Sequence, residues 1–508
     1  MAAAVISADT AAGWAVLAAV ALLTFLAYRL IYRVYLHPLA RFPGPPAAAV
    51  TWWWKTYVEV IRGRSFCHAL EGVHAQYGDI IRIGPDELHF ANPQAYLDIY
   101  NAKNRWNKEP KLYHCFNEDR SSFGFLTYRE AKERKDILNK TFSPKAIEQV
   151  QGLVLEKVDA LAAAFDRDVE QDTPTNMSYA FRCMTMDIIT YLCFGHAVDA
   201  LKVPNYRAPI IEAMDAALGS FVLFRNFEWF KSLILGIPPR ISRVISPPTR
   251  GLAELQLTLL EQISELTEHP ESLDHLPHKM TIYHALMDKD SYQNGTVPSA
   301  GSLYEEAQAL MFAGGDTTGN TLMMCSFHLM KNPEAHAKLR MELRAAWPDI
   351  HQPSPSLREL EKLPYLNGVI KEGLRLTSGV VSGLLRIVPP EGAKIAGTFV
   401  PGGTIVSCGS TFVHYNPKLF PEPQEFRPER WIENPSLDNY QVAFSKGPRM
   451  CLGINLAWVE LRYTVARIWR FYDMKADASS AKSLPFRDTF LPSYEGAPVM
   501  ARMEKVTA

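Results

Sequence analysis

A stretch of 18 uncharged, mostly hydrophobic residues, from Ala11 to Tyr28, stands near the start of the chain. Asp9 is the only charged side chain before Arg29. Trp14 and Tyr28 are of the types that favour the two interfaces of a bilayer. A helix of this length can cross the hydrocarbon core of a membrane. The pattern therefore predicts a transmembrane helix at about residues 11–28, with a buried core helix as the alternative.

Basic residues and prolines follow this stretch. Arg29, Arg33 and Arg41 favour a cytosolic downstream end, whereas a cleaved signal peptide would carry basic residues ahead of the apolar stretch. The prolines of Arg41-Phe-Pro-Gly-Pro-Pro46 cannot continue a helix, so this run is expected to act as a stiff hinge. We therefore expect a membrane anchor, a hinge and one large domain, at residues 1–40, 41–46 and 47–508.

The pattern of the large domain is mainly helical. Alternating segments at Ile80–Gly84 and Glu87–Phe90 predict a strand pair joined at Gly84-Pro85. Helical spacing then dominates, and the polar, proline-bearing segment 270–300 is expected to be an exposed connection. We predict a mainly α fold with a small β-rich lobe. Two helix faces illustrate the spacing: Leu363, Leu366, Ile370 and Leu374, and Leu303, Ala307, Leu310 and Gly314.

Composition adds two limits. The chain has 53 basic and 54 acidic residues and no long basic run, which argues against nucleic acid as a partner. Its seven cysteines are scattered without a C-x-x-C pair, which is typical of thiols in a reducing compartment.

One cysteine lies in a dense motif. Residues 444–453 have the pattern F-x-x-G-x-R-x-C-x-G, which is filled by Phe444, Gly447, Arg449, Cys451 and Gly453. Glycine lets the backbone pass close to a flat ligand where a Cβ would collide. Cys451 opens a predicted helix at 452–463, whose amides and dipole favour the thiolate form of the sulfur. A buried structural cysteine in a turn is the alternative.

A second motif lies in the helix predicted at about residues 302–330. It contains Ala313-Gly-Gly-Asp316-Thr317-Thr318, and each glycine inside a helix costs about 1 kcal/mol relative to alanine. One explanation for the glycines is that they let the helix backbone lie flat against a cofactor. The alternative is tight packing against a neighbouring helix through small residues.

These two motifs, in this order and about 135 residues apart, resemble those of the cytochrome P450 family of haem-thiolate monooxygenases. The resemblance covers nearly the whole chain after the anchor and implies the P450 fold with haem b as cofactor. It makes Cys451 the axial thiolate, which favours cleavage of the O–O bond. It makes Thr317 and Asp316 a proton-delivery pair. The remaining motif residues implied to contact the haem are Arg449, Gly447, Gly453, Phe444 and Gly314.

The resemblance also assigns charged residues outside the two motifs. Glu372, Arg375 and Arg430 are implied to form a structural network behind the cysteine loop. Arg386 and Arg134 are implied to bind haem carboxylates. Four residues before Arg134 the family usually has Trp or His, but this chain has Glu130. Either Tyr128 substitutes for the Trp or His, or the alignment of this segment with the family's motif is wrong. The alternative for Arg134 is a solvated basic helix face, where Lys132, Lys135 and Lys140 could meet an acidic electron donor.

The walls of the substrate site are expected to be apolar. The alternative for these aromatic residues is ordinary core packing. The residues expected to line the site are Phe116, Phe123, Ala313, Val381 and Tyr494.

These observations predict a single-pass enzyme of the endoplasmic reticulum membrane with a cytosolic catalytic domain. It would insert one oxygen atom from O2 into a small hydrophobic substrate, with electrons from NADPH through cytochrome P450 reductase and with cytochrome b5 as a further candidate donor. Runs such as Thr51-Trp-Trp-Trp-Lys55 resemble fungal members of the family that modify terpenoids and other secondary metabolites. The alternatives are a redox-neutral haem-thiolate isomerase or dehydratase, which would tend to lose the Asp316-Thr317 pair, and a non-catalytic haem sensor.

Overall fold

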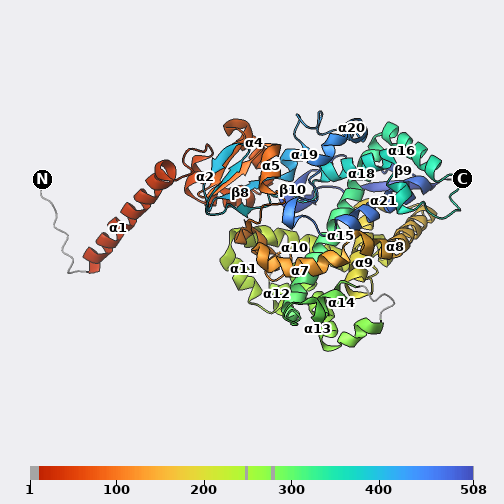
Figure 1. Cartoon of the computed structure of the whole chain (residues 1–508), viewed down its shortest axis with the longest axis horizontal. Coiled ribbons are helices and arrows are strands. Elements are labelled where there is room, and N and C mark those ends of the chain that lie inside the picture. The colour runs from red at the N-terminus through yellow and green to blue at the C-terminus, as the bar shows by residue number, and fades with distance from the viewer. Residues whose placement is uncertain (1–10, 246–249, 276–280, 507–508) are drawn as a thin grey trace.

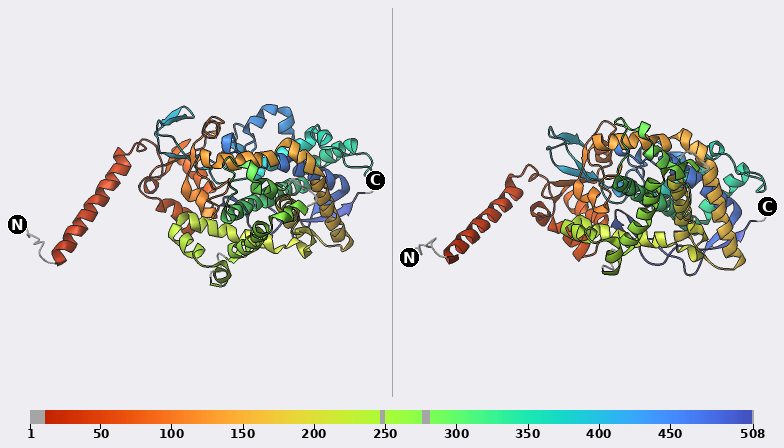
Figure 2. Two further views of the ribbon diagram at one scale, coloured as in Figure 1. Left: turned by 60° about the horizontal axis from the view of Figure 1, so that its bottom comes forward. Right: turned by 90° about the horizontal axis from the view of Figure 1, so that it is seen from below.

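The computed structural model describes residues 11–245, 250–275 and 281–506. Helix α1 (Ala11–Ile31) projects away from the rest of the molecule (Figures 1 and 2). The apolar span Gly13–Leu36 has a mean hydropathy of 2.0 and is not buried by the protein. By length and composition this helix could cross a membrane, in agreement with the prediction from the sequence.

The segment after α1 packs against the body. A π-helical turn (Tyr32–Leu36) follows α1, and residues 41–45 are not helical. Leu39 and Phe42 are buried in a cluster with the β-rich lobe. A Cβ at Gly44 would lie 2.2 Å from the carbonyl oxygen of Arg82, so the chain crosses this strand in close contact. The expected hinge is therefore docked on the lobe.

The β-rich lobe is built on a five-stranded sheet of order β1-β2-β8-β5-β3, in which β2 and β8 are parallel and the other pairs are antiparallel. The predicted hairpin is confirmed as β1 and β2. Smaller sheets pair β10 with β11, β6 with β7, and β4 and β9 with β12. The strands are β1 (Ile80–Gly84), β2 (Glu87–Phe90), β3 (Asn107–Lys108), β4 (Thr175–Asn176), β5 (Arg386–Ile387), β6 (Ala393–Ile395), β7 (Thr398–Val400), β8 (Ile405–Cys408), β9 (Tyr472–Ala476), β10 (Phe486–Thr489), β11 (Leu491–Tyr494) and β12 (Met500–Lys505).

Helices form the remainder, so the mainly α fold with a small β-rich lobe is confirmed (Figure 1). Besides α1, the helices of ten or more residues are α4 (Phe66–Tyr77), α7 (Tyr128–Thr141), α8 (Pro144–Glu170), α9 (Met177–Phe194), α10 (Pro209–Asn226), α13 (Arg250–Glu268), α15 (Ala300–Lys331), α16 (Pro333–Ala346), α18 (Pro364–Thr377) and α21 (Ile454–Phe471). The shorter ones are α2 (Pro46–Val50), α3 (Trp53–Thr56), α5 (Pro93–Ile99), α6 (Pro110–Tyr113), α11 (Glu228–Leu235), α12 (Pro239–Ile245), α14 (Ile282–Met287), α17 (Leu357–Leu360), α19 (Ser410–His414) and α20 (Glu429–Glu433).

Helix α15 runs through the middle of the helical region and packs along α9, α18 and α21. Of its predicted inner face, Leu303, Ala307 and Leu310 are buried and Gly314 is half-buried. The inner face predicted for α18 is also buried at Leu366, Ile370 and Leu374. Spacing at the helical period therefore identified both faces.

The expectation of an exposed connection at 270–300 is wrong in part. Residues 276–280 lie outside the described residues, but α14 follows them and buries Ile282, Tyr283 and Leu286 in the main core. The Tyr283 hydroxyl donates a hydrogen bond of 2.5 Å to the carbonyl of Leu303. These three apolar residues share one face of a short helix, and their burial holds α14 against the core although the residues around them are polar.

Candidate active site

A cavity of about 310 Å³ separates α15 from the segment that carries Cys451. Its lining combines residues from α6, α10, α15, α21, the β3 and β5 strands and the turn between β10 and β11. The two sequence motifs meet here. From them the cavity is lined by Ala313, Gly314, Thr317, Phe444, Arg449, Cys451 and Gly453.

The cysteine loop presents Cys451 to this cavity. Cys451 is exposed, whereas the other six cysteines are buried. Its backbone N–H donates to the carbonyl of Phe444 at 2.9 Å, which closes the loop. Helix α21 begins at Ile454, so the helix start predicted at 452 is wrong by two residues. The surrounding protein raises the pKa of the Cys451 thiol by desolvation, and the Gly453 amide and Lys135 act against this rise.

The two glycines of the loop have different roles. Gly453 lines the cavity, and a Cβ built there would meet no atom within 4 Å. This open space agrees with a flat ligand. Gly447 has φ of +75°, and its Cβ would lie 2.6 Å from the carbonyl oxygen of Tyr100. The expectation that Gly447 makes room for a cofactor is therefore corrected, because it makes room for a neighbouring backbone segment.

The glycines of α15 pack against α9. A Cβ at Gly314 would lie 2.6 Å from Ile189, and one at Gly315 would lie 2.4 Å from Met186. The tight-packing alternative thus accounts for both positions. Gly314 also lines the cavity, so it contributes to the site as well as to the helix contact.

Thr317 and Asp316 point in different directions from α15. Thr317 lines the cavity and its hydroxyl donates to the carbonyl of Ala313 at 2.8 Å. Asp316 is buried and accepts a hydrogen bond of 2.8 Å from Arg182 on α9. Arg182 also pairs at 2.7 Å with Asp215, whose side chain is 36% exposed. Burial raises the pKa of Asp316, and the Arg182 guanidinium counteracts this rise. A chain of charged groups thus connects the helix beside Thr317 with solvent.

Arg386 and Arg449 line the cavity without a carboxylate partner within 4.0 Å among the described residues. Arg386 donates to the Tyr113 hydroxyl at 2.6 Å. Arg449 donates to the carbonyl of Thr127 at 2.8 Å, and its Nε has no partner. Burial and the charge of Arg386 lower the pKa of Arg449 to about 10.

The placement predicted for Arg134 is wrong. Its guanidinium forms a buried ion pair of 2.7 Å with Glu306 on α15 and does not line the cavity. The next residue, Lys135, lines the cavity and donates to the carbonyl of Pro448 at 2.9 Å. Of these two neighbouring basic residues of α7, Lys135 and not Arg134 therefore reaches the cavity. Glu130 is an N-terminal capping residue, because its carboxylate accepts hydrogen bonds from Thr127.

Lys108 is a further cation of the site that the sequence did not reveal. It lines the cavity together with Arg386, Arg449 and Lys135, and none of the four has an ion-pair partner in the described part of the chain. The carboxyl groups that share the cavity do not compensate them. Burial raises the pKa of Glu118 and of Glu460 to about 8, and Glu306 is paired with Arg134. Because buried cations without counterions are costly, the cavity is suited to a ligand that carries acidic groups.

A charge network behind the cysteine loop has the predicted members. Glu372 accepts hydrogen bonds from Arg375 at 2.7 Å and from Arg430 at 3.1 Å, and all three side chains are buried. Trp431 donates to the same carboxylate at 2.8 Å, and Arg375 donates to the carbonyl of His414 at 2.9 Å. The network ties α18 to the segment 414–431.

Three of the five residues predicted for the substrate walls lie at the cavity. Phe116, Phe123 and Ala313 line the cavity. Val381 instead lines a separate recess, and Tyr494 packs against the main core, so both are corrected. Nearby residues line the cavity instead: Val380, next to Val381, and Leu491, at the other end of strand β11 from Tyr494. Apolar residues that the sequence did not single out as lining the cavity include Leu218, Leu310, Phe312 and Phe490.

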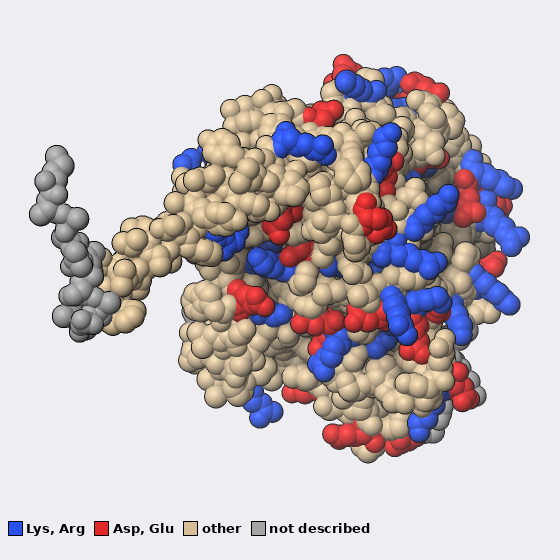
Figure 3. Space-filling model, turned by 60° about the vertical axis from the view of Figure 1, so that its left-hand side comes forward, with Lys and Arg blue, Asp and Glu red and all other residues tan. Residues whose placement is uncertain are grey.

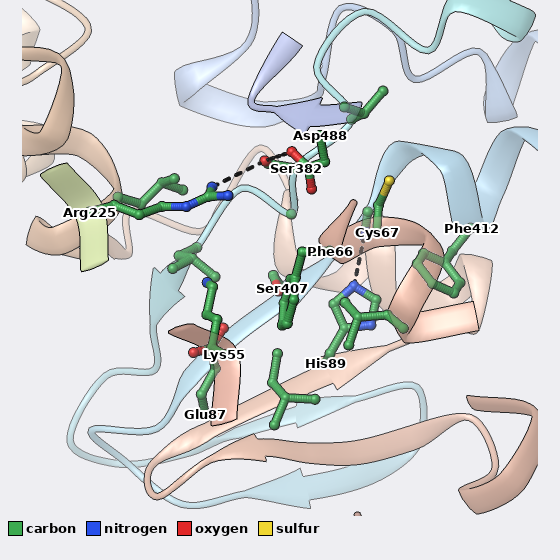
Figure 4. Close-up of a pocket in the computed structure, with 17 residues that line it drawn as sticks. Lys55, Phe66, Cys67, Glu87, His89, Arg225, Ser382, Ser407, Phe412 and Asp488 are labelled. Atoms are coloured by element: carbon green, nitrogen blue, oxygen red, sulfur yellow. Dashed lines mark hydrogen bonds between the residues drawn. The ribbon is translucent and has the colours of Figure 1, made fainter. Parts of the chain in front are cut away.

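The separate recess, of about 20 Å³, has a mixed lining of apolar and charged residues and adjoins the cavity at Ser382, which lines both (Figure 4). Arg225 contacts Ser382 at 3.5 Å, and Ser382 donates to Asp488. Glu87 on β2 is buried, and its Oε2 has no hydrogen-bond partner. Burial raises the pKa of Glu87 from 4.5 to about 7, with partial compensation by Lys55.

The Glu87→Gln variant is expected to remove part of the pH dependence of stability. Because the folded-state pKa is raised, the neutral form is favoured by folding, and stability is lost as pH rises from about 4.5 to about 7. The loss amounts to at most about 3 kcal/mol. Thermal unfolding at pH 5 and pH 8 should therefore show a smaller change for Glu87→Gln than for the unmodified protein. Asp86→Asn, at the exposed neighbouring residue, serves as control. If the stability of Glu87→Gln changed between pH 5 and pH 8 as much as that of the unmodified protein, the raised pKa would not belong to Glu87.

Comparison with known proteins gives consistent matches. A family model described as cytochrome P450 matches residues 43–495. A cytochrome P450 monooxygenase, flvC, of Aspergillus flavus is 33% identical over 506 residues, which covers 93% of each chain. The cytochrome P450 monooxygenase TRI4 of Fusarium sporotrichioides is 31% identical, with 87% of this chain and 85% of the relative covered. The cytochrome P450 monooxygenase tpcC of Cochliobolus heterostrophus is 31% identical, with 88% and 86% covered.

Proposed function

Because the chain belongs to the cytochrome P450 family, we propose that it is a membrane-anchored monooxygenase of fungal secondary metabolism with Cys451 as its axial haem ligand. The family consists of haem-thiolate oxidoreductases that use O2 and a redox partner. The observation that carries the proposal is the position of Cys451, the one exposed cysteine, in a cavity that also holds unpaired buried cations. In this proposal Arg386 and Arg449 bind the haem carboxylates. When bound, the haem supplies the redox chemistry that activates O2.

Proton delivery is proposed for Asp316 and Thr317. Thr317 holds a hydroxyl at the cavity wall, on the face of α15 that the substrate would meet. Asp316 lies outside the cavity, but Arg182 connects it to the partly exposed Asp215. A rotation of the Asp316 side chain away from Arg182 would bring a solvent-derived proton towards the Thr317 hydroxyl. General acid catalysis requires such a hydrogen-bonded route together with a group whose pKa suits the working pH.

The Thr317→Ala variant tests this role. Product formed per NADPH consumed should fall by about tenfold or more, and hydrogen peroxide should account for the difference, because proton delivery is no longer directed at the cavity wall. The measurement compares product, peroxide and NADPH in the reconstituted enzyme. The control is Thr321→Ala, one turn further along α15, where the hydroxyl donates to the carbonyl of Thr317 at 3.0 Å. Unchanged coupling in Thr317→Ala would contradict the proposal.

The substrate is proposed to be a bulky hydrophobic molecule such as a terpenoid. Phe116, Phe221, Phe312 and Phe490 form an aromatic wall with ring-centroid distances of 4.8–5.6 Å along the chain of contacts. Thr317, Ala313 and Gly314 of α15 also line the cavity. Ala313 and Gly314 are small residues and leave room for a substrate beside the aromatic wall. The wall provides apolar area but few hydrogen-bond donors, which suits a substrate with little functionality.

The membrane is proposed to contact the body as well as α1. Large exposed side chains lie on α3, α11 and the turn after α3, and Trp53 contacts Phe227 with ring centroids 6.1 Å apart. On the face shown in Figure 3, charged side chains are fewer around the base of α1 than towards the opposite edge of the same face. We place the enzyme on the endoplasmic reticulum with its body in the cytosol, since Arg29 and Arg33 follow the apolar span. The exposed residues concerned are Trp53 (65%), Ile61 (68%), Trp229 (68%) and Leu233 (57%).

Electron transfer is proposed to use the surface beside the cysteine loop. Lys135 binds the loop carbonyls of Pro448 and Met450, and Met450 is exposed. Lys132 and Lys140 are exposed on the same helix, α7. An NADPH-dependent cytochrome P450 reductase with an acidic docking face, or cytochrome b5, would suit this surface.

The proposed parts of the chain remain an anchor, a docked connector and a catalytic domain, at residues 1–40, 41–46 and 47–508.

Deletion of residues 1–31 should leave the body folded with haem but still bound to phosphatidylcholine vesicles. This cut keeps Leu39 and Phe42, which are buried in the β-rich lobe. Adding Trp229→Glu and Leu233→Glu should then release the protein, because the second hydrophobic contact is lost. Flotation of the deletion variant, with and without the two substitutions, measures this. Full release on deletion alone would contradict a second membrane contact.

A further inference from the structure

Glu118 places a carboxyl group beside the aromatic wall of the cavity. It lies between Phe116 and Phe123 on one loop, and all three residues line the cavity. Glu118 is only 4% exposed. Its Oε1 accepts a hydrogen bond of 3.0 Å from Gln308, whereas its Oε2 has no hydrogen-bond partner among the described residues. A buried polar atom of this kind is costly unless a ligand satisfies it.

Helix α15 holds the Glu118 carboxyl group in a fixed position. Gln308 of this helix donates to the carbonyl of Phe116 at 2.7 Å as well as to Glu118. The Tyr304 hydroxyl in turn donates to Gln308 at 2.9 Å. Phe312 follows Gln308 by four residues, so it lies one turn further along the same face of α15, where it lines the cavity. The carboxyl group is therefore preorganised next to the aromatic wall.

Two carboxylates of α15 fix the rest of the loop. Glu305 accepts a hydrogen bond of 2.8 Å from the Arg120 side chain. Glu306 accepts hydrogen bonds from the N–H and the hydroxyl of Ser122, at 2.8 and 2.6 Å. These contacts lie on the C-terminal side of Glu118 and limit its movement. A ligand pocket with few polar groups relies on such fixed positions to orient its ligand.

The surroundings of Glu118 favour its neutral form. Burial raises the pKa of Glu118 to about 8, and the nearby charges of Glu306 and Glu305 add to this rise. The hydrogen bond from Gln308 and the charge of Lys108 act in the opposite direction. At pH 7 the carboxyl group is therefore mainly protonated, and it has a hydroxyl that can donate a hydrogen bond.

This protonation state decides which kind of ligand group suits Glu118. Binding an amine as an ion pair would require the carboxyl group to ionise, which burial opposes. Binding an oxygen acceptor, such as a carbonyl or a hydroxyl, requires no change of charge. The aromatic residues on both sides supply apolar contacts for the remainder of such a molecule.

We propose that Glu118 is a specificity-determining residue that binds a carbonyl or hydroxyl oxygen of an otherwise hydrophobic substrate. The inference rests on the proposed function and adds one oxygen-bearing group to the substrate class. The contact fixes one end of the hydrocarbon skeleton, so that a defined part of it faces the loop of Cys451. Glu118 binds substrate in this proposal and takes no part in proton delivery.

The experiment measures how the holoenzyme distinguishes a ketone from the hydrocarbon of the same skeleton. The probes are camphor with bornane and androstanone with androstane, and dissociation constants come from the change in Soret absorption. At least one ketone should bind the unmodified enzyme about three- to tenfold more tightly than its hydrocarbon, which corresponds to one net hydrogen bond. Glu118→Leu should abolish this preference. Glu118→Gln should retain it, because the amide still donates.

Asp119→Asn is the matched control, since Asp119 is the neighbouring carboxylate and does not line the cavity. This variant should keep the full preference for the ketone. If no ketone is preferred by the unmodified enzyme, the proposal is overturned. An equal loss of affinity for ketone and hydrocarbon in Glu118→Leu would also overturn it, because Glu118 would then only support the loop.

The pH dependence provides a second test that does not require Glu118→Leu to fold. The donating hydroxyl is present below the pKa of Glu118 and is lost as pH rises through about 8. The ketone preference of the unmodified enzyme should therefore decline between about pH 7 and pH 9, whereas that of Glu118→Gln should not. The same pH profile in both proteins would contradict the proposal. Absence of a thiolate spectrum in the unmodified enzyme would instead refute the assignment of Cys451 and would leave the ketone preference as measured.

Discussion

Cys451→Ala is expected to abolish the spectrum of thiolate-ligated haem and all monooxygenase activity. All seven cysteines lie in the described part of the chain, and the six other than Cys451 are buried. The reduced unmodified enzyme with carbon monoxide should show the red-shifted Soret band of thiolate ligation. The variant should lack this band even if it retains haem through its carboxylate contacts.

Cys408→Ala provides the matched control. Cys408 is a buried thiol at the end of β8 that also lines the cavity. This variant should keep the thiolate band, because its sulfur is not proposed to bind iron. A red-shifted band that survives in Cys451→Ala, or disappears only in Cys408→Ala, would contradict the assigned ligand.

Glu372→Ala is expected to prevent accumulation of folded holoenzyme. The substitution leaves the buried guanidinium groups of Arg375 and Arg430 without their shared carboxylate and removes the acceptor for Trp431. Removal of one partner from a buried ion pair typically costs about 3–5 kcal/mol, a large part of the stability of a domain. Yield of haem-loaded protein and thermal unfolding measure the effect.

The control for this variant is an exposed pair in the same region. Arg427 and Glu433 form an ion pair of 2.8 Å with side chains 45% and 56% exposed. Glu433→Ala should therefore change stability by less than about 1 kcal/mol. Similar yields of holoenzyme for Glu372→Ala and Glu433→Ala would show that the buried network does not support the fold.

The sequence was most informative where local pattern decides the structure. The uncharged stretch before Arg29, the alternation around Gly84 and the spacing of Leu366 and Ile370 each identify an element, because side-chain period reflects backbone geometry. The run ending in Gly453 identified the loop that presents Cys451 to the cavity. These features need no knowledge of distant contacts.

The sequence was least informative where tertiary contacts decide a role. Arg134 and Lys135 are adjacent and both basic, and only the position of Glu306 on α15 determines which one turns away from the cavity. Gly447 is required by the carbonyl of Tyr100, a contact between segments far apart in the chain. Lys108 has no motif of its own, and it lies beside Arg386 in the cavity only because β3 pairs with β5.

Asp316 illustrates an intermediate case. Its place beside Thr317 was evident from the sequence, but adjacent helical residues point about 100° apart. The structure accordingly directs Asp316 to Arg182 and Thr317 to the cavity. The charge partner could not be predicted, because α9 approaches α15 only in the folded protein.

Incorporation of labelled oxygen tests the central claim most directly. The full-length enzyme, in membranes with an NADPH-dependent reductase, is supplied with ¹⁸O2 and a panel of terpenoids and polyketides, and products are analysed by mass spectrometry. The account predicts a product that carries one ¹⁸O atom per oxidation and that requires both NADPH and the reductase. A product that forms without label or without electrons would contradict it and would indicate a redox-neutral isomerase or dehydratase.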